Sequence, residues 1–269
     1  MSTTLRFDVQ GQQGPQVETI LLSSGLGGAA AFWLPQLPRL AARYRVITYD
    51  HRGTGRNAQP LDEGHRIDDM ADDVVAILDQ AGVERCHLVG HALGGLIGLS
   101  LALRHQHRLQ SLAVVNGWAS GNAHTRRCFD ARLHLLASAG AQAYCEAQPL
   151  FLYPPAWSLT HQARIRAEVA HALENFPGEA NVRARIAALL AFEVADRLGH
   201  IELPVLLSAS RDDFLVPWTC SQALAEALPC ATLDIVEGGG HAMCATQPDA
   251  FNGTLLHFLA RHACTEIVS

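Results

Sequence analysis

Short apolar runs typical of β-strands alternate with helix-like segments along most of the chain, and this alternation constrains the fold more than any other feature of the sequence. The runs are almost continuously apolar, which is typical of strands that are buried on both faces of a parallel sheet. They are VETILLSS (17–24), YRVITYD (44–50), CHLVG (86–90), SLAVVNG (111–117), PVLLSAS (204–210) and ATLDIVEG (231–238). The alternation therefore predicts an α/β fold with a mostly parallel sheet and helices on both of its faces.

The alternation stops between residue 118 and about residue 196. This segment contains no convincing strand, and YPPAW and NFPG interrupt its helical patterns. Those patterns run from Thr125 to Ala139, from Gln162 to Ala172 and from Val182 to Phe192. We expect residues 118–196 to form a helical cap, inserted into a core that residues 1–117 and 197–269 build together.

Composition narrows the class of partner. The chain has 269 residues, 49% of them hydrophobic, which is enough for one sizeable core. A formal net charge of -6 argues against nucleic acid or an anionic membrane as the main partner, so we expect a small molecule instead. No apolar stretch has the length of a membrane span, and the start MSTTLRFDVQ lacks the features of a signal peptide, so a cytoplasmic location is expected. A homodimer is compatible with the sequence.

The cysteines and histidines do not suggest a metal centre. The seven cysteines are widely spaced and include no C-x-x-C pair, so they predict reduced structural thiols, without a disulfide framework or a zinc site. His105 and His107 form a close pair at the far end of a predicted helix, without an evident third ligand. We therefore expect no metal and no cofactor.

The first strand-end loop, SSGLGGAA, raises the possibility of a nucleotide site. Its G-x-G-x-x-A spacing fits a dinucleotide fingerprint, and Asp50 ends the next strand about 20 residues later, where a ribose-binding acid could lie. That fingerprint requires a helix that begins directly on the glycines. Pro35 and Pro38 interrupt the segment where this helix would run, which argues against a dinucleotide fold.

GHALG, residues 90–94, lies between an apolar run and a helix-like stretch, as a nucleophile elbow of the form Gly-x-Ser-x-Gly does. So sharp a turn needs small residues around its apex, and Gly90, Gly94 and Gly95 provide them. A glycine-rich turn without a catalytic role is the alternative, although an unstrained turn would not need this pattern. The apex is Ala92, where the attacking serine would be expected.

Taken together, the loops resemble those of the α/β-hydrolase family. SSGLGG stands at the position of the oxyanion loop, VITYDHRGTGRN matches a strand followed by D-x-R-G-x-G, GHALG matches the elbow, and SRDDFLVP and GGGHA match the acid and histidine loops. The order of elbow, acid and histidine is also the order of this family. The resemblance covers nearly the whole chain outside the cap and implies the α/β-hydrolase fold.

The resemblance implies a base and an acid at the active site. It assigns the base to His241, for which a solvated histidine at a helix N-terminus remains the alternative. Asp212 and Asp213 are adjacent, and either could be the acid. In the family the acid usually lies four positions before a proline of the same loop, which selects Asp213, four positions before Pro217.

Backbone groups complete the expected site. The N–H groups of Leu26 and Leu93 are the expected donors to a developing oxyanion, and they do not depend on a serine. Asp50, Arg52 and Gly53 are expected to brace the sheet behind the site.

Ala92 has three explanations. It could be a deliberate inactivating substitution in an ester or C–C bond hydrolase; it could mark a non-catalytic small-molecule binding protein that descends from hydrolases; or it could be native in an enzyme that forms no covalent intermediate. A receptor would not need His241 and Asp213, and their presence favours an enzyme.

A closer resemblance favours the native residue. GHALGGLIG, VVNGW, NAHTRRCF, GAQAYCEAQPLFLYP and CSQALAEALP resemble the small hydrolases of the Rut pathway of pyrimidine breakdown, a group that includes the GHALG form. The cap run NAHTRRCF is the most specific part. This resemblance implies a role late in uracil nitrogen catabolism, in which a carbon–nitrogen bond other than a peptide bond is hydrolysed. The substrate would be carbamate, giving ammonia and carbon dioxide, or aminoacrylate, giving malonic semialdehyde.

Both of these reactions also occur spontaneously, so a modest acceleration is enough. We expect water to occupy the space of the serine hydroxyl and His241, held by Asp213, to deprotonate it. General-base help of this kind gives about 10²- to 10⁴-fold acceleration.

A small anionic substrate requires a cationic or polar anchor. Arg126 and Arg127, in NAHTRRCF, are the candidates, with a solvated helix face as their alternative. Asn116 and Trp118 follow a strand on the side of the expected site. Asn116 could hydrogen-bond the substrate, and Trp118 could instead pack under the cap.

The methyl group at the apex predicts that serine-directed phosphonates do not label the protein, because residue 92 has no hydroxyl to attack phosphorus. Intact-mass spectrometry after phosphonate treatment checks this. A stoichiometric adduct on a residue of the elbow would contradict a non-covalent mechanism.

Overall fold

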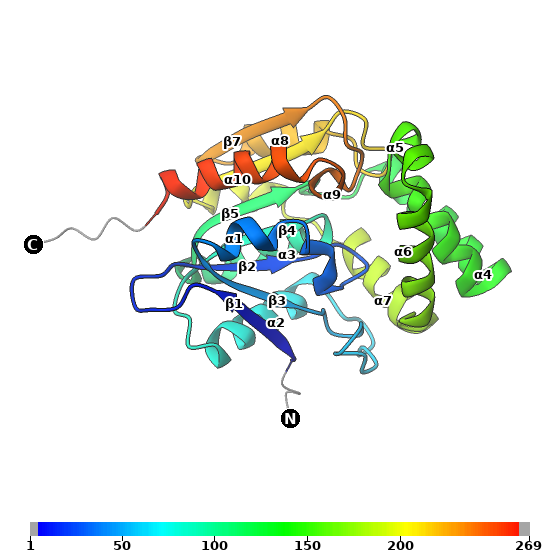
Figure 1. The fold of residues 1–269 in the computed structure, drawn as a ribbon, viewed down its shortest axis with the longest axis horizontal. Coiled ribbons are helices and arrows are strands. Elements are labelled where there is room, and N and C mark those ends of the chain that lie inside the picture. Colours follow the sequence, from blue (N-terminus) through cyan, green and yellow to red (C-terminus); the bar gives the residue numbers. More distant parts are fainter. Residues whose placement is uncertain (1–4, 264–269) are drawn as a thin grey trace, which may run out of the picture.

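The computed structural model describes residues 5–263, and a seven-stranded sheet runs through its centre (Figure 1). The strands are β1 (Phe7–Gly11), β2 (Thr19–Ser23), β3 (Arg45–Tyr49), β4 (Cys86–His91), β5 (Leu109–Val115), β6 (Val205–Ser210) and β7 (Ala231–Val236). They lie in the order β1-β3-β2-β4-β5-β6-β7, and every neighbouring pair is parallel except β1 and β3. The predicted α/β fold is thereby confirmed, and each of the six expected strands is present.

The sequence reasoning missed β1. This strand is a short antiparallel edge strand whose residues are mostly exposed, so it lacks the continuous apolar run that identified the others.

Helices cover both faces of the sheet because successive strand residues point to opposite sides. Ile20 and Leu22 pack in one apolar layer with α1 (Leu37–Ala41) and α10 (Pro248–Arg261), whereas Leu21 packs in the other with α2 (Ile67–Gln80) and α3 (Leu93–His105). The elements of the core other than strands are η1 (Ala30–Trp33), α1 (Leu37–Ala41), α2 (Ile67–Gln80), α3 (Leu93–His105), η2 (Gln106–Arg108), η3 (Ala195–His200), α8 (Thr219–Ala227), α9 (Met243–Thr246) and α10 (Pro248–Arg261).

Four helices fill the segment between β5 and β6: α4 (Ala123–Leu152), α5 (Pro155–Thr160), α6 (Gln162–Glu174) and α7 (Glu179–Leu190). Figure 1 shows them grouped beyond the ends toward which the parallel strands point. α4 extends well past the predicted helix, and Gly140, with φ 79° and ψ -173°, breaks it into two parts. A bridge between Ser120 and Glu193 joins the two ends of the segment. The helices therefore cover the sheet edge at which a ligand would bind.

The loop after β3 braces neighbouring elements. Arg52 forms a bidentate ion pair with Asp73 of α2, and the Asp50 carboxylate accepts hydrogen bonds from the N–H of Ala30 (2.8 Å) and from Arg56. Asp50 thus ties this loop to the chain that follows the SSGLGG loop.

Within residues 5–263, no helix is long and apolar enough to cross a membrane, and no group of three or more His, Cys, Asp or Glu side chains is arranged to hold a metal ion. The six cysteines of that range are unpaired thiols, and Cys264 lies outside the described residues.

Candidate active site

The turn between β4 and α3 places Ala92 at a sharp apex. Its φ of 47° and ψ of -111° are a conformation that residues with a side chain rarely adopt, so the turn stores strain. A Cβ added at Gly90 would strike the Gly94 carbonyl, and one at Gly94 would strike the carbonyl of Ser23. The glycines of GHALG are therefore required by close backbone contacts, whichever residue stands at the apex.

Next to the apex, a buried histidine and a buried carboxylate form a pair. His241 Nδ1 lies 2.8 Å from Asp213 Oδ2, and the two side chains are 3% and 0% exposed. A carboxylate accepts hydrogen bonds, so Nδ1 is the donor and the Nε2 lone pair is left available. The other carboxylate oxygen accepts from the N–H groups of Leu215 (2.8 Å) and Val216 (2.9 Å), which fixes the orientation of Asp213.

The neighbouring acid, Asp212, has a different place. Its carboxylate accepts hydrogen bonds from the hydroxyl of Ser210 and from the N–H groups of Gly239 and Gly240. Asp212 therefore holds the loop that carries His241.

The backbone of His241 is held by two side chains. Its carbonyl oxygen accepts from Asn116 Nδ2 (2.6 Å) and from His91 Nε2 (2.8 Å), and Asn116 Oδ1 accepts from the N–H of Ser210. From the sequence, Asn116 could hydrogen-bond the substrate. In the structure, both polar atoms of its buried amide are engaged with backbone groups, and Asn116 does not line the cavity.

His91 is a site residue that the sequence reasoning missed, although it lies inside GHALG. Its Nε2 donates to the His241 carbonyl, so its Nδ1 is an acceptor, and this atom is buried without a hydrogen-bond partner. Burial, and then the nearby His241, lower the pKa of His91 to about 3. The imidazole is therefore neutral at physiological pH.

The two residues expected to supply oxyanion donors both belong to the cavity wall. They are Leu26 and Leu93, and neither N–H donates to any residue in 5–263. Arg185 of α7 holds the backbone of Leu26 in place, because its Nε and Nη2 donate to the Leu26 carbonyl at 3.2 and 3.0 Å. Arg185 also donates to the carbonyl of Arg52 and contacts His51 Nδ1, and burial lowers its pKa to about 10. A cap helix thus fixes the loop that carries Leu26.

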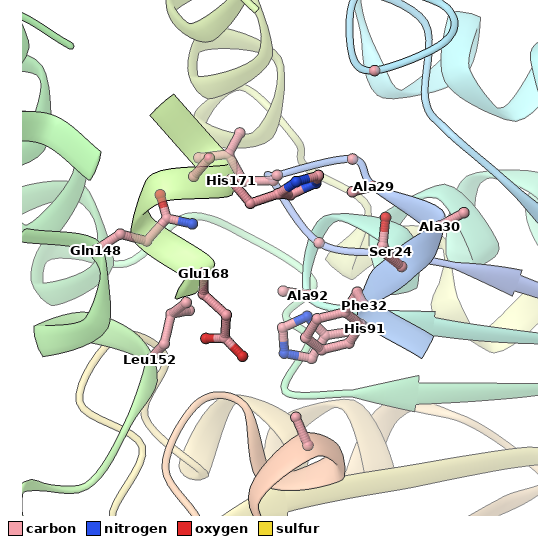
Figure 2. Close-up of a pocket in the computed structure, with 18 of the residues that line it drawn as sticks. Ser24, Ala29, Ala30, Phe32, His91, Ala92, Gln148, Leu152, Glu168 and His171 are labelled. Carbon is pink, nitrogen blue, oxygen red and sulfur yellow. The ribbon is translucent and has the colours of Figure 1, made fainter. Parts of the chain in front are cut away.

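A cavity of about 1140 Å³ connects these groups with the cap helices. Figure 2 shows Ser24, His91 and Ala92 on one side of it and Gln148 and Glu168, from α4 and α6, on the other.

Four lining atoms are buried without a hydrogen-bond partner: Ser24 Oγ, His91 Nδ1, the Trp118 indole Nε1 and Arg132 Nε. Buried polar atoms normally have partners, so these atoms mark where a polar ligand or water would bind.

Of the expected anchors, Trp118 lines the cavity, whereas Arg126 and Arg127 do not. Both arginines lie on the exposed side of α4, and Arg126 donates to the carbonyl of Leu190. The structure therefore places both arginines outside the wall of the cavity. Residues of α4 point into the cavity from its buried face instead, and Arg132 is one of them.

Sequence comparisons identify close relatives. A family model described as the alpha/beta hydrolase fold matches residues 18–137. A protein named "Putative carbamate hydrolase RutD" from Variovorax paradoxus (strain S110) is 57% identical over 258 residues, which are 96% of this chain and 96% of the relative. A protein of the same name from Pantoea ananatis is 48% identical, over 96% of this chain and 94% of the relative.

A solved structure, the enol-lactonase from Burkholderia xenovorans LB400, superposes with a TM-score of 0.86 at 22% identity, over 95% of this chain and 96% of the other. At this identity the likeness shows the fold alone, and it agrees with the sheet and helix arrangement described above.

Ala92→Ser should create a covalent esterase, because it adds a hydroxyl at a turn that already has the glycines a serine would need. We expect a burst of product from an activated aryl ester, with an acyl group trapped on residue 92, and a stability cost below about 1 kcal/mol. Stopped-flow absorbance and mass spectrometry measure the burst and the adduct. The burst should vanish in the double variant Ala92→Ser, His241→Ala; a folded Ala92→Ser protein without a burst would show that the base or the oxyanion donors are misaligned.

His91 should make the protein less stable in acid. The folded protein keeps this imidazole neutral down to about pH 3, whereas the unfolded chain binds a proton below about pH 6.5, so stability falls as the pH drops from 6.5. His91→Gln should reduce the slope of unfolding free energy against pH by about 0.7 kcal/mol per pH unit at pH 6.5, rising toward the one-proton limit of about 1.4 near pH 5.

Urea unfolding at several pH values measures this slope. His134→Gln, which removes an exposed histidine, is the matched control and should leave the slope unchanged. The same slope for His91→Gln and the parent protein would contradict the assignment.

Proposed function

Because the chain belongs to the RutD family of α/β hydrolases, we propose that it acts in pyrimidine (uracil) catabolism and accelerates the hydrolysis of carbamate or of aminoacrylate. The observation that carries this proposal is the buried His241–Asp213 pair, whose histidine lines the cavity although the apex at Ala92 has no nucleophile. A catalytic base is retained where covalent catalysis is absent.

The nucleophile in this proposal is water. Asp213 holds the proton of His241 on Nδ1, so Nε2 can accept a proton from a water molecule in the cavity. The methyl group of Ala92 leaves the space that a serine hydroxyl would fill. Negative charge that develops on the substrate is received by the N–H groups of Leu26 and Leu93, whose hydrogens are not used elsewhere within the described chain.

For carbamate, the water oxygen bonds to the carboxyl carbon and the carbon–nitrogen bond breaks. His241 takes a proton from water and returns it to the departing nitrogen, so that H₂N–COO⁻ and H₂O give NH₃ and HCO₃⁻, the hydrated form of carbon dioxide. The base is regenerated in each turnover.

For aminoacrylate, the water oxygen bonds to the carbon that carries nitrogen. One proton of the water ends on the neighbouring carbon and the other on the departing ammonia, so that H₂N–CH=CH–COO⁻ and H₂O give OHC–CH₂–COO⁻ and NH₃. The same base serves both proton transfers.

This mechanism requires only a modest rate acceleration from the protein. General-base catalysis supplies about 10²- to 10⁴-fold acceleration, which is enough for reactions that also proceed in water. A stable ester would need the covalent route that Ala92 removes.

A non-catalytic binding protein is the second candidate, and Ala92 is the observation that favours it. An ester or C–C bond hydrolase with a substituted serine would show the same apex. Neither a receptor nor a scaffold has a use for a histidine whose tautomer a buried carboxylate fixes, so the enzyme is the better explanation of the site.

Ammonia release from freshly generated carbamate and aminoacrylate, with and without the protein, tests the proposal. We expect faster release with the parent protein and a fall of about 10²- to 10⁴-fold in the protein-dependent rate in His241→Ala, because the base is lost. The protein-dependent rate should also fall in Asp213→Asn, because the amide of asparagine no longer fixes the tautomer of His241.

His134→Gln is again the exposed control and should keep the parent rate. Equal ammonia release with and without protein, or an unchanged rate in His241→Ala, would refute the enzyme and leave the binding protein.

A further inference from the structure

The wall of the cavity contains a buried guanidinium that has no carboxylate partner. Arg132, on α4, is 4% exposed and lines the cavity. It forms no ion pair with any residue in 5–263; instead, its guanidinium carbon lies 5.3, 5.1 and 5.5 Å from the ring centres of Phe129, Tyr144 and Phe151. A buried charge is costly unless a counter-charge and hydrogen bonds compensate it, so this cation lacks an anion.

The hydrogen bonds of Arg132 leave donors free. Nη2 donates to the Tyr144 hydroxyl at 2.9 Å and, at a long 3.4 Å, to Gln148 Oε1. Nε is buried without a partner, and the described residues offer Nη1 no hydrogen bond. A guanidinium with unused N–H groups matches the two oxygens of a carboxylate.

The other arginines that line the cavity are already engaged. Arg185 donates to backbone carbonyls, Arg164 pairs with Glu168, and Arg56 pairs with Asp50 and Asp8. Arg132 is therefore the cavity arginine that has charge and donors left for a ligand.

We propose that Arg132 is the carboxylate anchor of the cavity. It binds the carboxylate group of a small ligand, so that a carbon other than the carboxyl carbon faces the water beside His241. This inference rests on the proposed function and extends it to the substrate class. The three rings exclude water from the guanidinium, and an ion pair is stronger in such surroundings than in solvent.

Arg132 and His241 are surrounded by different parts of the chain, so a carboxylate on Arg132 and a carbon that reacts beside His241 would be different groups of the ligand. Phe129, Tyr144, Gln148 and Phe151 all belong to α4, whereas the groups that contact His241 come from the end of β4 and from the loops after β5 and β6. Figure 2 shows Gln148, which accepts from Arg132, across the cavity from His91 and Ala92. The substrate class is therefore a short carboxylate whose carbon–nitrogen bond is on a carbon other than the carboxyl carbon. Aminoacrylate has this arrangement, and carbamate, with one carbon, does not.

Binding of propanoate and of its neutral isostere propanamide tests the anchor without turnover. In NMR titrations we expect the parent protein to bind propanoate more tightly than propanamide, because only the acid offers a carboxylate. Arg132→Gln should weaken propanoate binding about 10- to 100-fold and leave propanamide binding unchanged. Arg132→Lys, which keeps the charge and loses the planar fork, should give an intermediate affinity.

Two further variants separate the anchor from general effects of charge and folding. Arg126→Gln removes an exposed arginine of the same helix and should bind propanoate as the parent does. Gln148→Glu keeps Arg132 and places a carboxylate beside it, which should occupy the anchor and abolish the preference for propanoate. Thermal unfolding of each variant confirms that it is folded.

The outcomes separate this inference from the proposed function. Loss of propanoate preference in Arg132→Gln or Gln148→Glu supports the anchor even if the parent protein releases no ammonia. Equal affinities for propanoate and propanamide in the parent, or parent-like propanoate binding in both variants, would overturn the anchor even if hydrolysis is observed. With aminoacrylate, a raised KM and a retained kcat in Arg132→Lys support it further.

Discussion

The close contact of backbones at the elbow is the constraint on which the rest of the site depends. Gly90 packs against Gly94, and Gly94 packs against Ser23 at the end of β2, so the turn brings β4, α3 and the first loop together. This contact puts the N-terminus of α3 and the Leu26 loop beside the same apex. The strain is set by backbone geometry, and the apex keeps its shape although Ala92 has no hydroxyl.

Around the elbow, loops from distant parts of the chain hold one another. Asn116 and His91 fix the backbone of His241, the amides after Asp213 fix its carboxylate, and Arg185 reaches from the cap to the Leu26 carbonyl. Most of these contacts are hydrogen bonds to backbone groups, which set orientation with little dependence on side-chain flexibility. The cap is thereby part of the machinery as well as the cover of the cavity.

Helical periodicity explains why Arg126 and Arg127 lie outside the cavity wall, whereas Arg132 lines the cavity. Arg126 and Arg127 lie in the most specific cap motif, but a helix buries one stripe at intervals of three or four residues. The buried positions of the first part of α4 are Thr125, Cys128, Phe129, Arg132 and Leu136. Arg132 falls on this stripe, and an arginine on an apolar stripe is the signal that could have identified it as a buried residue of the cavity wall.

The sequence by itself determined the sheet, the elbow and the order of the chemical loops, because these features follow from local rules: apolar runs for buried strands, and glycines where backbones touch. It missed β1, whose pairing with β3 depends on a partner strand about 40 residues away and not on its own apolar pattern. Only the tertiary structure decided that Asn116 holds a loop, that His91 is a buried neutral imidazole, and that Arg132 lacks a counter-charge. Each of these depends on which groups from other parts of the chain come within a few ångströms, and residue spacing does not encode such distances.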